Sequence, residues 1–354
     1  MSKIVLKARD LDGYLSPADK EIIKAMDGKY EEALGVCSIL SQAEGENSIN
    51  MAKERLIVLY SEMGEMMQEI TQKEPQIHVY SFETPQMSHG EASRLIAKLR
   101  NPGTENPEFV YYTQRAYELL FNLAFGGANN KNKNHIFVKT PVDIPVQNYA
   151  VHKIPDIDER VNNSVMCVML RAALLPSMIV SKEIQEYSSN NYITPFALFR
   201  ISRDDTKSEH NMAYTLDLDK SYFDLDLLQG KDLVFADPMN ATGGSLVTIV
   251  KYLQDKGIKP RSIKFFNIIS VLKGSLRIVR ALENVEVFTL WMDPSLNSKA
   301  YILPGLGDAG DRINGMDRKE YHRNMIQLIA DYGAGIASLY RSQLREIEDT
   351  VLGR

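Results

Sequence analysis

The sequence has 354 residues, 44% of them hydrophobic and 25% charged, as expected of a globular protein with a buried core. Lys and Arg number 41 and Asp and Glu 46, so the formal net charge of −5 argues against a chain drawn as a whole to nucleic acid or anionic membranes. The N-terminus lacks the apolar stretch of a secretion signal, and the most apolar segment, 164–181, carries Arg171 and Pro176. We therefore expect a cytoplasmic protein without a transmembrane segment.

The first predicted elements are two helices joined by a short polar loop. Ser16 is a suitable N-cap for a helix over residues 16–41, with Pro17 at its first position. Apolar or small residues then recur three and four positions apart, at Ile23, Met26, Tyr30, Ala33, Cys37 and Leu40, and again at Ile49, Ala52, Leu56, Leu59, Met63, Met66 and Ile70. The two seams predict an antiparallel hairpin within an N-terminal extension, residues 1–76, that packs on the main domain or against another subunit.

The placement of cysteine and histidine argues against a metal centre built from protein side chains. Cys37 and Cys167 both lie in apolar stretches, which predicts two buried thiols in a reducing compartment. The six histidines are scattered without the spacing of a metal site. We therefore predict no protein metal ligands.

From residue 77 onward, short apolar runs alternate with helical segments, which predicts an α/β domain over residues 77–316. The expected strand–helix–strand units are 165–170, 174–187 and 193–201, then 233–236, 245–256 and 263–271, with 285–292 as a further strand. This order predicts an open, mostly parallel sheet flanked by helices, with functional residues at the carboxyl ends of its strands. A charged helix is expected in a C-terminal extension, residues 317–354.

The most informative motif is VFADPMNATGGS, in which an apolar strand ends at Asp237 and a helix follows the two glycines. Gly243 and Gly244 let successive backbone N–H groups converge, Thr242 and Ser245 add hydroxyl donors, and the helix N-terminus carries partial positive charge. The motif lacks the Gly-Lys-Ser/Thr ending of nucleoside triphosphate loops, so it predicts a site for a monophosphate, with Asp237 about one ribose away. The alternative is a tight turn with Asp237 as a cap.

The run DPMNATGGS resembles the phosphoribosyl pyrophosphate (PRPP) loop of type I phosphoribosyltransferases. Downstream, YILPGLGDAGDR at residues 301–312 resembles the uracil-binding hood of the uracil phosphoribosyltransferase family, although on its own it reads as an ordinary glycine-rich loop. The resemblance implies a PRPP site at Asp237, Pro238, Met239, Asn240, Ala241, Thr242, Gly243, Gly244, Ser245 and Asp308. It implies that uracil contacts Ile302, Gly307, Asp308 and Ala309.

Two arginines are candidates for binding the pyrophosphate group. Arg171 follows an apolar strand, where an unpaired guanidinium is costly, and by resemblance it holds the leaving pyrophosphate. The alternative is a structural ion pair. Arg203 resembles the family's second pyrophosphate arginine, and its alternative is a solvated arginine beside Asp204 and Asp205.

More weakly, 95–126 resembles the family's first helices and 136–149 an early pair of strands. Two positions depart from the family pattern. Ala173 stands where the family has glycine, so its Cβ is expected to hinder the backbone of the pyrophosphate loop. Asp204 and Asp205 replace a longer acidic pair after Arg203.

The resemblance implies an enzyme that makes UMP and pyrophosphate from uracil and PRPP in pyrimidine salvage. Asp237, Arg171 and Arg203 are its expected catalytic residues, with Mg²⁺ bound mainly through PRPP. A homodimer or higher homo-oligomer is expected, with no nucleic acid or membrane partner. The alternative function is a catalytically silent sensor of UMP, uracil or PRPP, for which Ala173 is the main support.

Overall fold

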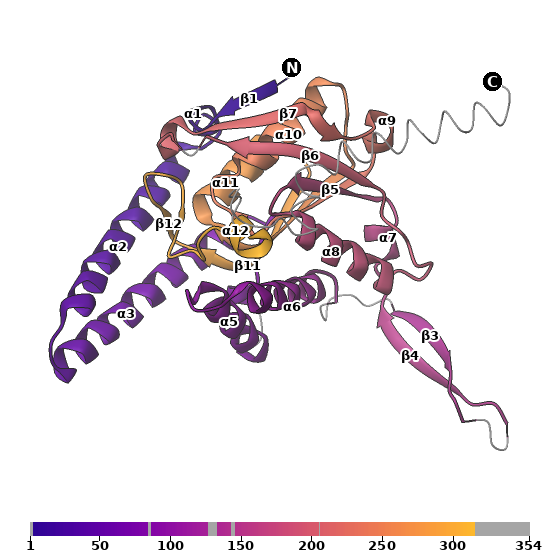
Figure 1. Cartoon of the computed structure of the whole chain (residues 1–354), viewed down its shortest axis with the longest axis horizontal. Coiled ribbons are helices and arrows are strands. Elements are labelled where there is room, and N and C mark those ends of the chain that lie inside the picture. The colour runs from indigo at the N-terminus through magenta and orange to yellow at the C-terminus, as the bar shows by residue number, and fades with distance from the viewer. Residues whose placement is uncertain (1–2, 84–85, 127–132, 143–145, 205, 316–354) are drawn as a thin grey trace.

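One large sheet forms the centre of the molecule, as the computed structural model shows for residues 3–83, 86–126, 133–142, 146–204 and 206–315 (Figure 1). Its strand order is β1-β7-β6-β5-β8-β10-β11-β2. The strands are β1 (Lys3–Lys7), β2 (Ile77–Val79), β5 (Ser164–Leu170), β6 (Phe196–Arg203), β7 (Ala213–Tyr222), β8 (Asp232–Ala236), β10 (Ser262–Val271) and β11 (Val285–Asp293). From β6 to β2 along this order, neighbouring strands pair in parallel. Strand β7 pairs antiparallel with both of its neighbours, β6 and β1. The predicted open, mostly parallel sheet is confirmed.

Both predicted strand–helix–strand units are present, with ends that differ by a few residues. In the first, α8 (Leu174–Tyr187) joins β5 to β6, and in the second, α10 (Gly244–Asp255) joins β8 to β10. Every residue of β5 is buried, because the sheet is covered by helices on both faces. Alternate side chains of β5 therefore enter two different cores.

The two cores lie on opposite faces of the sheet. One contains residues of α10 and α11 (Leu272–Ala281) together with residues of the N-terminal helices. The other contains residues of α5 (Gln86–Arg100), α6 (Asn106–Phe125) and α8, which include the predicted first helices of the domain. This three-layer arrangement leaves the ends of the strands accessible between the helices.

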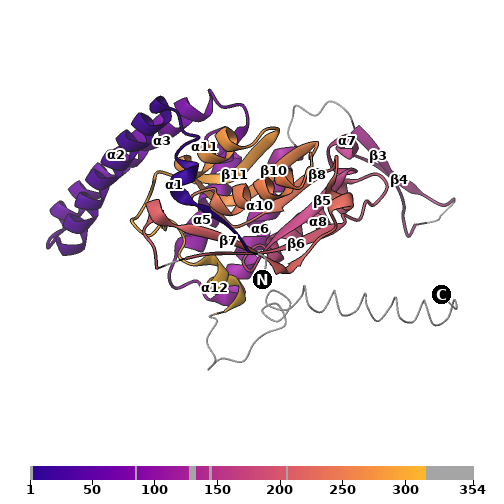
Figure 2. The same ribbon diagram turned by 90° about the horizontal axis from the view of Figure 1, so that it is seen from above.

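The N-terminal hairpin is present as α2 (Pro17–Gln42) and α3 (Glu46–Thr71), which lie side by side and project from the body (Figures 1 and 2). Ser16 accepts the backbone N–H of Asp19, and Asp19 accepts that of Ser16, which confirms the predicted start. The predicted seam is buried as far as Ala33, but Cys37 is exposed. The prediction of two buried thiols is therefore wrong for Cys37, because this part of α2 lies beyond the main body, whereas Cys167 is buried in β5.

Other parts of the chain follow the predictions less closely. Strand β1 pairs with β7, so the segment before the hairpin joins the edge of the main sheet. The predicted strand pair near residues 136–149 is present as β3 (Lys133–Lys139) and β4 (Tyr149–Pro155), an antiparallel sheet of its own. The predicted helix within 317–354 lies outside the described residues, and the boundary at residue 76 stays a prediction.

The remaining elements are short. They are α1 (Ala8–Leu11), α4 (Tyr80–Glu83), α7 (Asp158–Val161), α9 (Leu225–Leu228), α12 (Ala309–Asn314), the 3-10 turn η1 (Glu209–Asn211), and strands β9 (Met239–Asn240), β12 (Ser295–Leu296) and β13 (Ile302–Leu303). Within the described part of the chain, no helix combines the length and apolar character needed to cross a membrane.

Candidate active site

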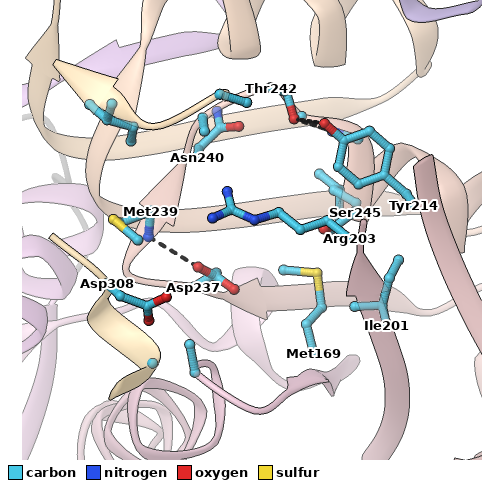
Figure 3. A pocket seen from close by; sticks show the side chains of 18 of the residues that line it. Met169, Ile201, Arg203, Tyr214, Asp237, Met239, Asn240, Thr242, Ser245 and Asp308 are labelled. Atoms are coloured by element: carbon cyan, nitrogen blue, oxygen red, sulfur yellow. Dashed lines mark hydrogen bonds between the residues drawn. The ribbon is translucent and has the colours of Figure 1, made fainter. Parts of the chain in front are cut away.

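A cleft of about 620 Å³ lies where β5, β6 and β8 end, and two chain segments far apart in sequence form its sides (Figure 3). One side is the loop 237–245 between β8 and α10, and the other is formed by residues of the hood, 301–312, together with Ala300. Most of the predicted site residues line it: Arg171, Arg203, Asp237, Met239, Asn240, Ala241, Thr242, Gly243, Gly244, Ser245, Ile302, Gly307 and Asp308. The structure thus brings together residues that the motifs had only suggested separately.

Pro238 and Ala309 are not among the residues that line this cleft. The Pro238 carbonyl accepts the N–H of Ile269, which attaches the start of the loop to β10. Ala309 is the first residue of α12 and is fully buried in the core on the α6 side of the sheet. Both residues hold backbone that borders the cleft, and their side chains lie outside it.

The predicted phosphate loop leads directly into α10. Gly243 is the N-cap with φ of +75°, a conformation that favours glycine, and a Cβ there would lie 2.8 Å from the Gly274 carbonyl oxygen. At Gly244 a Cβ would lie 2.1 Å from the Tyr214 ring. The two glycines therefore allow the loop to sit against its neighbours while the helix N-terminus faces the cleft.

Polar contacts hold this loop in place. The Tyr214 hydroxyl hydrogen-bonds the Thr242 hydroxyl, which itself accepts the N–H of Gly244 at 3.4 Å (Figure 3). The buried Asn240 amide donates to the hydroxyls of Ser270 and Ser275 at 3.3 Å each. Since each contact reaches a different element of the fold, the loop has a defined shape before any ligand binds.

Asp237 lies at the carboxyl end of β8 and accepts the backbone N–H of Met239 at 3.0 Å (Figure 3). Burial raises the pKa of its carboxyl group to about 6, and the hydrogen bond from Met239 and the positive charge of Arg203 limit the rise. The nearby Asp308 carboxylate adds to the rise. At neutral pH, Asp237 therefore carries a negative charge at the floor of the cleft.

Arg203 ends β6 and reaches into the cleft, where Figure 3 shows its guanidinium between Asn240 and Asp237. The guanidinium also lies over the Tyr301 ring, 5.0 Å from the ring centre. Arg203 thus links the strand β6 to the hood, and it is not simply a solvated arginine beside Asp204.

Arg171 also lines the cleft, directly after β5, and donates to the Asp311 carboxylate at 2.8 Å. Arg171 therefore forms the ion pair of the alternative interpretation and also lines the cleft. Ala173 adopts φ −79° and ψ −3°, which any L-residue tolerates, and its side chain is buried in the core. The expected hindrance at Ala173 is wrong in this structure, because the backbone there is right-handed helical.

The hood is fixed to the helices behind it by the buried Asp293 and the half-buried Arg312. The Asp293 carboxylate accepts the N–H of Gly305 at 3.0 Å and a bond from Arg100 at 2.5 Å. Arg312 donates to backbone carbonyls of the α5–α6 connection and to the Leu306 carbonyl. These contacts shape the glycine-rich path that places Ile302, Gly307 and Asp308 along the cleft.

Comparison with known proteins decides the family. A family model described as uracil phosphoribosyltransferase matches residues 86–315. The chain belongs to the uracil phosphoribosyltransferase family. A uracil phosphoribosyltransferase from Campylobacter concisus is 30% identical over 227 residues, 64% of this chain and 95% of the relative, and one from Polaromonas naphthalenivorans is 47% identical over 88 residues, 25% and 41% of the two chains. The solved AQ2163 protein of Aquifex aeolicus aligns at 21% identity and a TM-score of 0.46, over 68% and 98%.

The uracil phosphoribosyltransferase match begins at residue 86, so β1, α2 and α3 lie outside it. The family is one of pentosyltransferases, which fits a cleft between the predicted phosphate loop and the hood. Sequence reasoning missed Tyr214, which lines the cleft from the unpredicted strand β7. It also missed Asp293 and assigned no role to Arg312. No local motif marks these residues, because their partners are distant in sequence.

The cleft of this uracil phosphoribosyltransferase-family chain offers few side-chain oxygen donors for the predicted Mg²⁺. Among the described residues, no group of three or more His, Cys, Asp or Glu side chains could hold a metal ion. The cleft does contain the carboxylates of Asp237 and Asp308. One or two carboxylates together with substrate phosphates are a usual donor set for Mg²⁺, so these residues fit an ion that arrives with PRPP.

Proposed function

We propose that this chain transfers the phosphoribosyl group of PRPP to uracil, forming UMP and pyrophosphate, and so serves pyrimidine salvage. The observation that carries the proposal is the position of two segments across one cleft. The loop 237–245 offers backbone N–H groups and hydroxyls for the 5-phosphate, and the hood, residues 301–312, lies opposite it. Two ligands held in this way react as neighbours, which removes much of the entropic barrier to their encounter.

At the donor end, the phosphate of PRPP would accept hydrogen bonds from the N-terminus of α10 and from Thr242 and Ser245. Arg171 and Arg203 enter the same cleft from the ends of β5 and β6, where their positive charges would bind the pyrophosphate. At the other end, backbone groups of the hood near Ile302 and Gly307 would pair with the polar edge of uracil.

The reaction breaks the bond between sugar C1 and the pyrophosphate oxygen and forms a bond from C1 to a ring nitrogen of uracil, whose proton passes to solvent. The transition state carries positive charge on the sugar. The Asp237 carboxylate lies at the floor of the cleft, where it would stabilise that charge. Mg²⁺, held by oxygens of PRPP and by Asp237 or Asp308, would neutralise part of the charge of the leaving pyrophosphate. No protein nucleophile is needed.

The test is to incubate the purified chain with radiolabelled uracil, PRPP and MgCl₂ and to measure UMP and pyrophosphate. We expect both products in equal amounts, formed about 100-fold more slowly by the Asp237→Asn variant. Binding of uracil and PRPP without any UMP would overturn the proposal in favour of a sensor. Orotate and hypoxanthine in place of uracil test the base, and UMP formation without added Mg²⁺ in the presence of EDTA would contradict the proposed role of the ion.

A homodimer or higher homo-oligomer remains part of the proposal. The described surface includes exposed apolar side chains on the hairpin, such as Met51 and Ile57, and on the β3–β4 arm, such as Phe137. Exposed apolar groups of this kind favour association between protein surfaces. Sedimentation equilibrium of the full chain tests it, and a monomer at micromolar concentration would contradict it.

A further inference from the structure

Two acidic residues of the N-terminal segment bond residues of the elements next to the cleft, although this segment lies outside the family match. On the hood side, the Ser295 hydroxyl of β12 donates to the Asp27 carboxylate of α2 at 2.6 Å. On the Arg203 side, the fully buried Arg277 of α11 bonds the Asp12 carboxylate at 2.5 Å and lies 2.9 Å from the Glu209 carboxylate. Two acidic residues of the N-terminal segment are thus connected to the two walls between which the ligands would bind.

The hood contact continues directly to the proposed uracil site. Strand β12 pairs with β13, with Ser295 opposite Leu303 and Leu296 opposite Ile302. Ile302 lines the cleft. A small cavity of about 190 Å³ lies between α2, α11 and β12 and is lined in part by Asp27 and Ser295. Because packing is incomplete here, the hydrogen bond has a larger part in fixing β12 than it would in a filled core.

The second contact continues to the strand that follows Arg203. Glu209 lies in η1, between β6 and β7, and also accepts a bond from Lys273 at 2.9 Å. Its backbone N–H donates to the Ser298 carbonyl at 2.7 Å, in the turn between β12 and β13. Asp12 therefore supports Arg277, and Arg277 and Lys273 together hold Glu209. Glu209 in turn joins the β6–β7 connection to the hood.

We propose that Asp27 and Asp12 are positioning residues of the phosphoribosyl transfer: Asp27 holds the uracil side of the cleft through Ser295, and Asp12 holds the Arg203 side through Arg277 and Glu209. This inference rests on the proposed function. It assigns the N-terminal segment a role in substrate affinity, beyond a general contribution to folding. Neither residue lines the cleft, so each acts through its partners.

Steady-state kinetics with each substrate varied in turn distinguishes positioning from folding. Asp27→Asn should raise KM for uracil about three- to tenfold, as expected when a hydrogen bond to a charged acceptor becomes one to a neutral acceptor, with KM for PRPP changed less than twofold. Asp12→Asn should raise KM for PRPP about threefold or more and should raise KM for uracil as well, because Glu209 also bonds the hood turn at Ser298. Ser295→Ala should reproduce Asp27→Asn, and the double variant should be no worse than either single one.

Asp19 provides the matched control on the same helix. It is buried on α2, bonds Arg280 of α11 and caps the helix, and it has no contact with either wall of the cleft. Asp19→Asn should lower Tm and leave both KM values unchanged. Equal changes in both KM values for Asp27→Asn, or KM changes in Asp19→Asn that match those of Asp27→Asn, would overturn the inference.

The proposed function and this inference can fail separately. If the natural chain forms UMP but Asp27→Asn and Ser295→Ala keep its KM for uracil, the inference is wrong and the function stands. If the natural chain forms no UMP, the proposed function fails, and dissociation constants for uracil and PRPP, measured by calorimetry on the same variants, take the place of KM. Asp27→Asn then still must weaken uracil binding more than PRPP binding.

Discussion

The hydroxyl of Tyr214 hydrogen-bonds the hydroxyl of Thr242, which joins the antiparallel strand β7 to the loop that ends at α10. The ring of the same tyrosine lies where a side chain at Gly244 would have to be. Tyr214 thus supports the proposed phosphate loop both by a polar contact and by its shape. Burial raises the pKa of its hydroxyl, so it stays protonated at neutral pH and able to donate.

Tyr214→Phe removes the hydroxyl but keeps the ring. We expect KM for PRPP to rise about three- to tenfold, the effect of one lost hydrogen bond, with little change in KM for uracil. Steady-state kinetics measure this change. Tyr252→Phe is the control, because Tyr252 lies further along α10 and outside the cleft. An unchanged KM for PRPP in Tyr214→Phe would contradict the supporting role of the hydroxyl.

Gly244→Ala places a methyl group 2.1 Å from the Tyr214 ring, so either the loop or the tyrosine must move. We expect a loss of about 1–3 kcal/mol in unfolding free energy and weaker PRPP binding. Gly28→Ala is the matched control, because Gly28 lies within α2 with no atom within 4 Å of an added Cβ, and it should stabilise the protein by about 0.5–1 kcal/mol. Urea titration measures both. Equal stability of the two variants would show that the loop can accommodate a methyl group at position 244.

Asp237→Asn replaces the carboxylate at the cleft floor with a neutral amide of the same shape. The positive charge of the transition state then loses its nearest proposed partner, so kcat should fall about 100-fold, with KM for uracil within about threefold of the natural value. Single-turnover measurements separate this loss from slow product release. An unchanged rate of the chemical step would remove Asp237 from the proposed role.

Activity should decline at acidic pH because of the same residue. The carboxyl pKa of about 6 lies above the ordinary value of 3.8, so in the free protein Asp237 becomes neutral as the pH falls below about 6. We expect kcat/KM for PRPP to fall along an acidic limb near pH 6, and this limb to be absent in Asp237→Asn. Because the folded state binds this proton more tightly, Asp237 also lowers stability as pH rises from about 4 to 6, and the variant should lack that loss.

Arg171→Ala removes a cation that lines the cleft and bonds Asp311. We expect the dissociation constants of PRPP and of pyrophosphate to rise at least about tenfold, and that of uracil to change little, since a charge-assisted contact to phosphate contributes about 1.5–3 kcal/mol. Calorimetry with each ligand measures this. Arg115→Ala, at a surface pair with Glu118, is the control. Equal weakening of uracil and PRPP would favour a purely structural ion pair.

Much of the architecture was predictable because its signals are local. Each buried strand of the two parallel units is a short apolar run, and the capping residues Ser16 and Asp19 mark the start of α2. Strands β1 and β7 were not predicted. Strand β1 is an edge strand and β7 lies next to it, and in both several side chains are exposed and the apolar pattern is diluted.

The sequence by itself determined which residue types could bind a phosphorylated sugar and a base, because the glycines, hydroxyls and Asp237 of one loop are adjacent in the chain. Only the tertiary structure decided that Arg171, Arg203 and the hood share a cleft with that loop. It also showed that Ala173 tolerates its backbone conformation, that Cys37 is exposed, and that Tyr214 supports the loop. The physical reason is that dihedral preferences and caps act over a few residues, whereas contacts such as Tyr214 with Thr242 or Ser295 with Asp27 depend on how whole strands and helices pack.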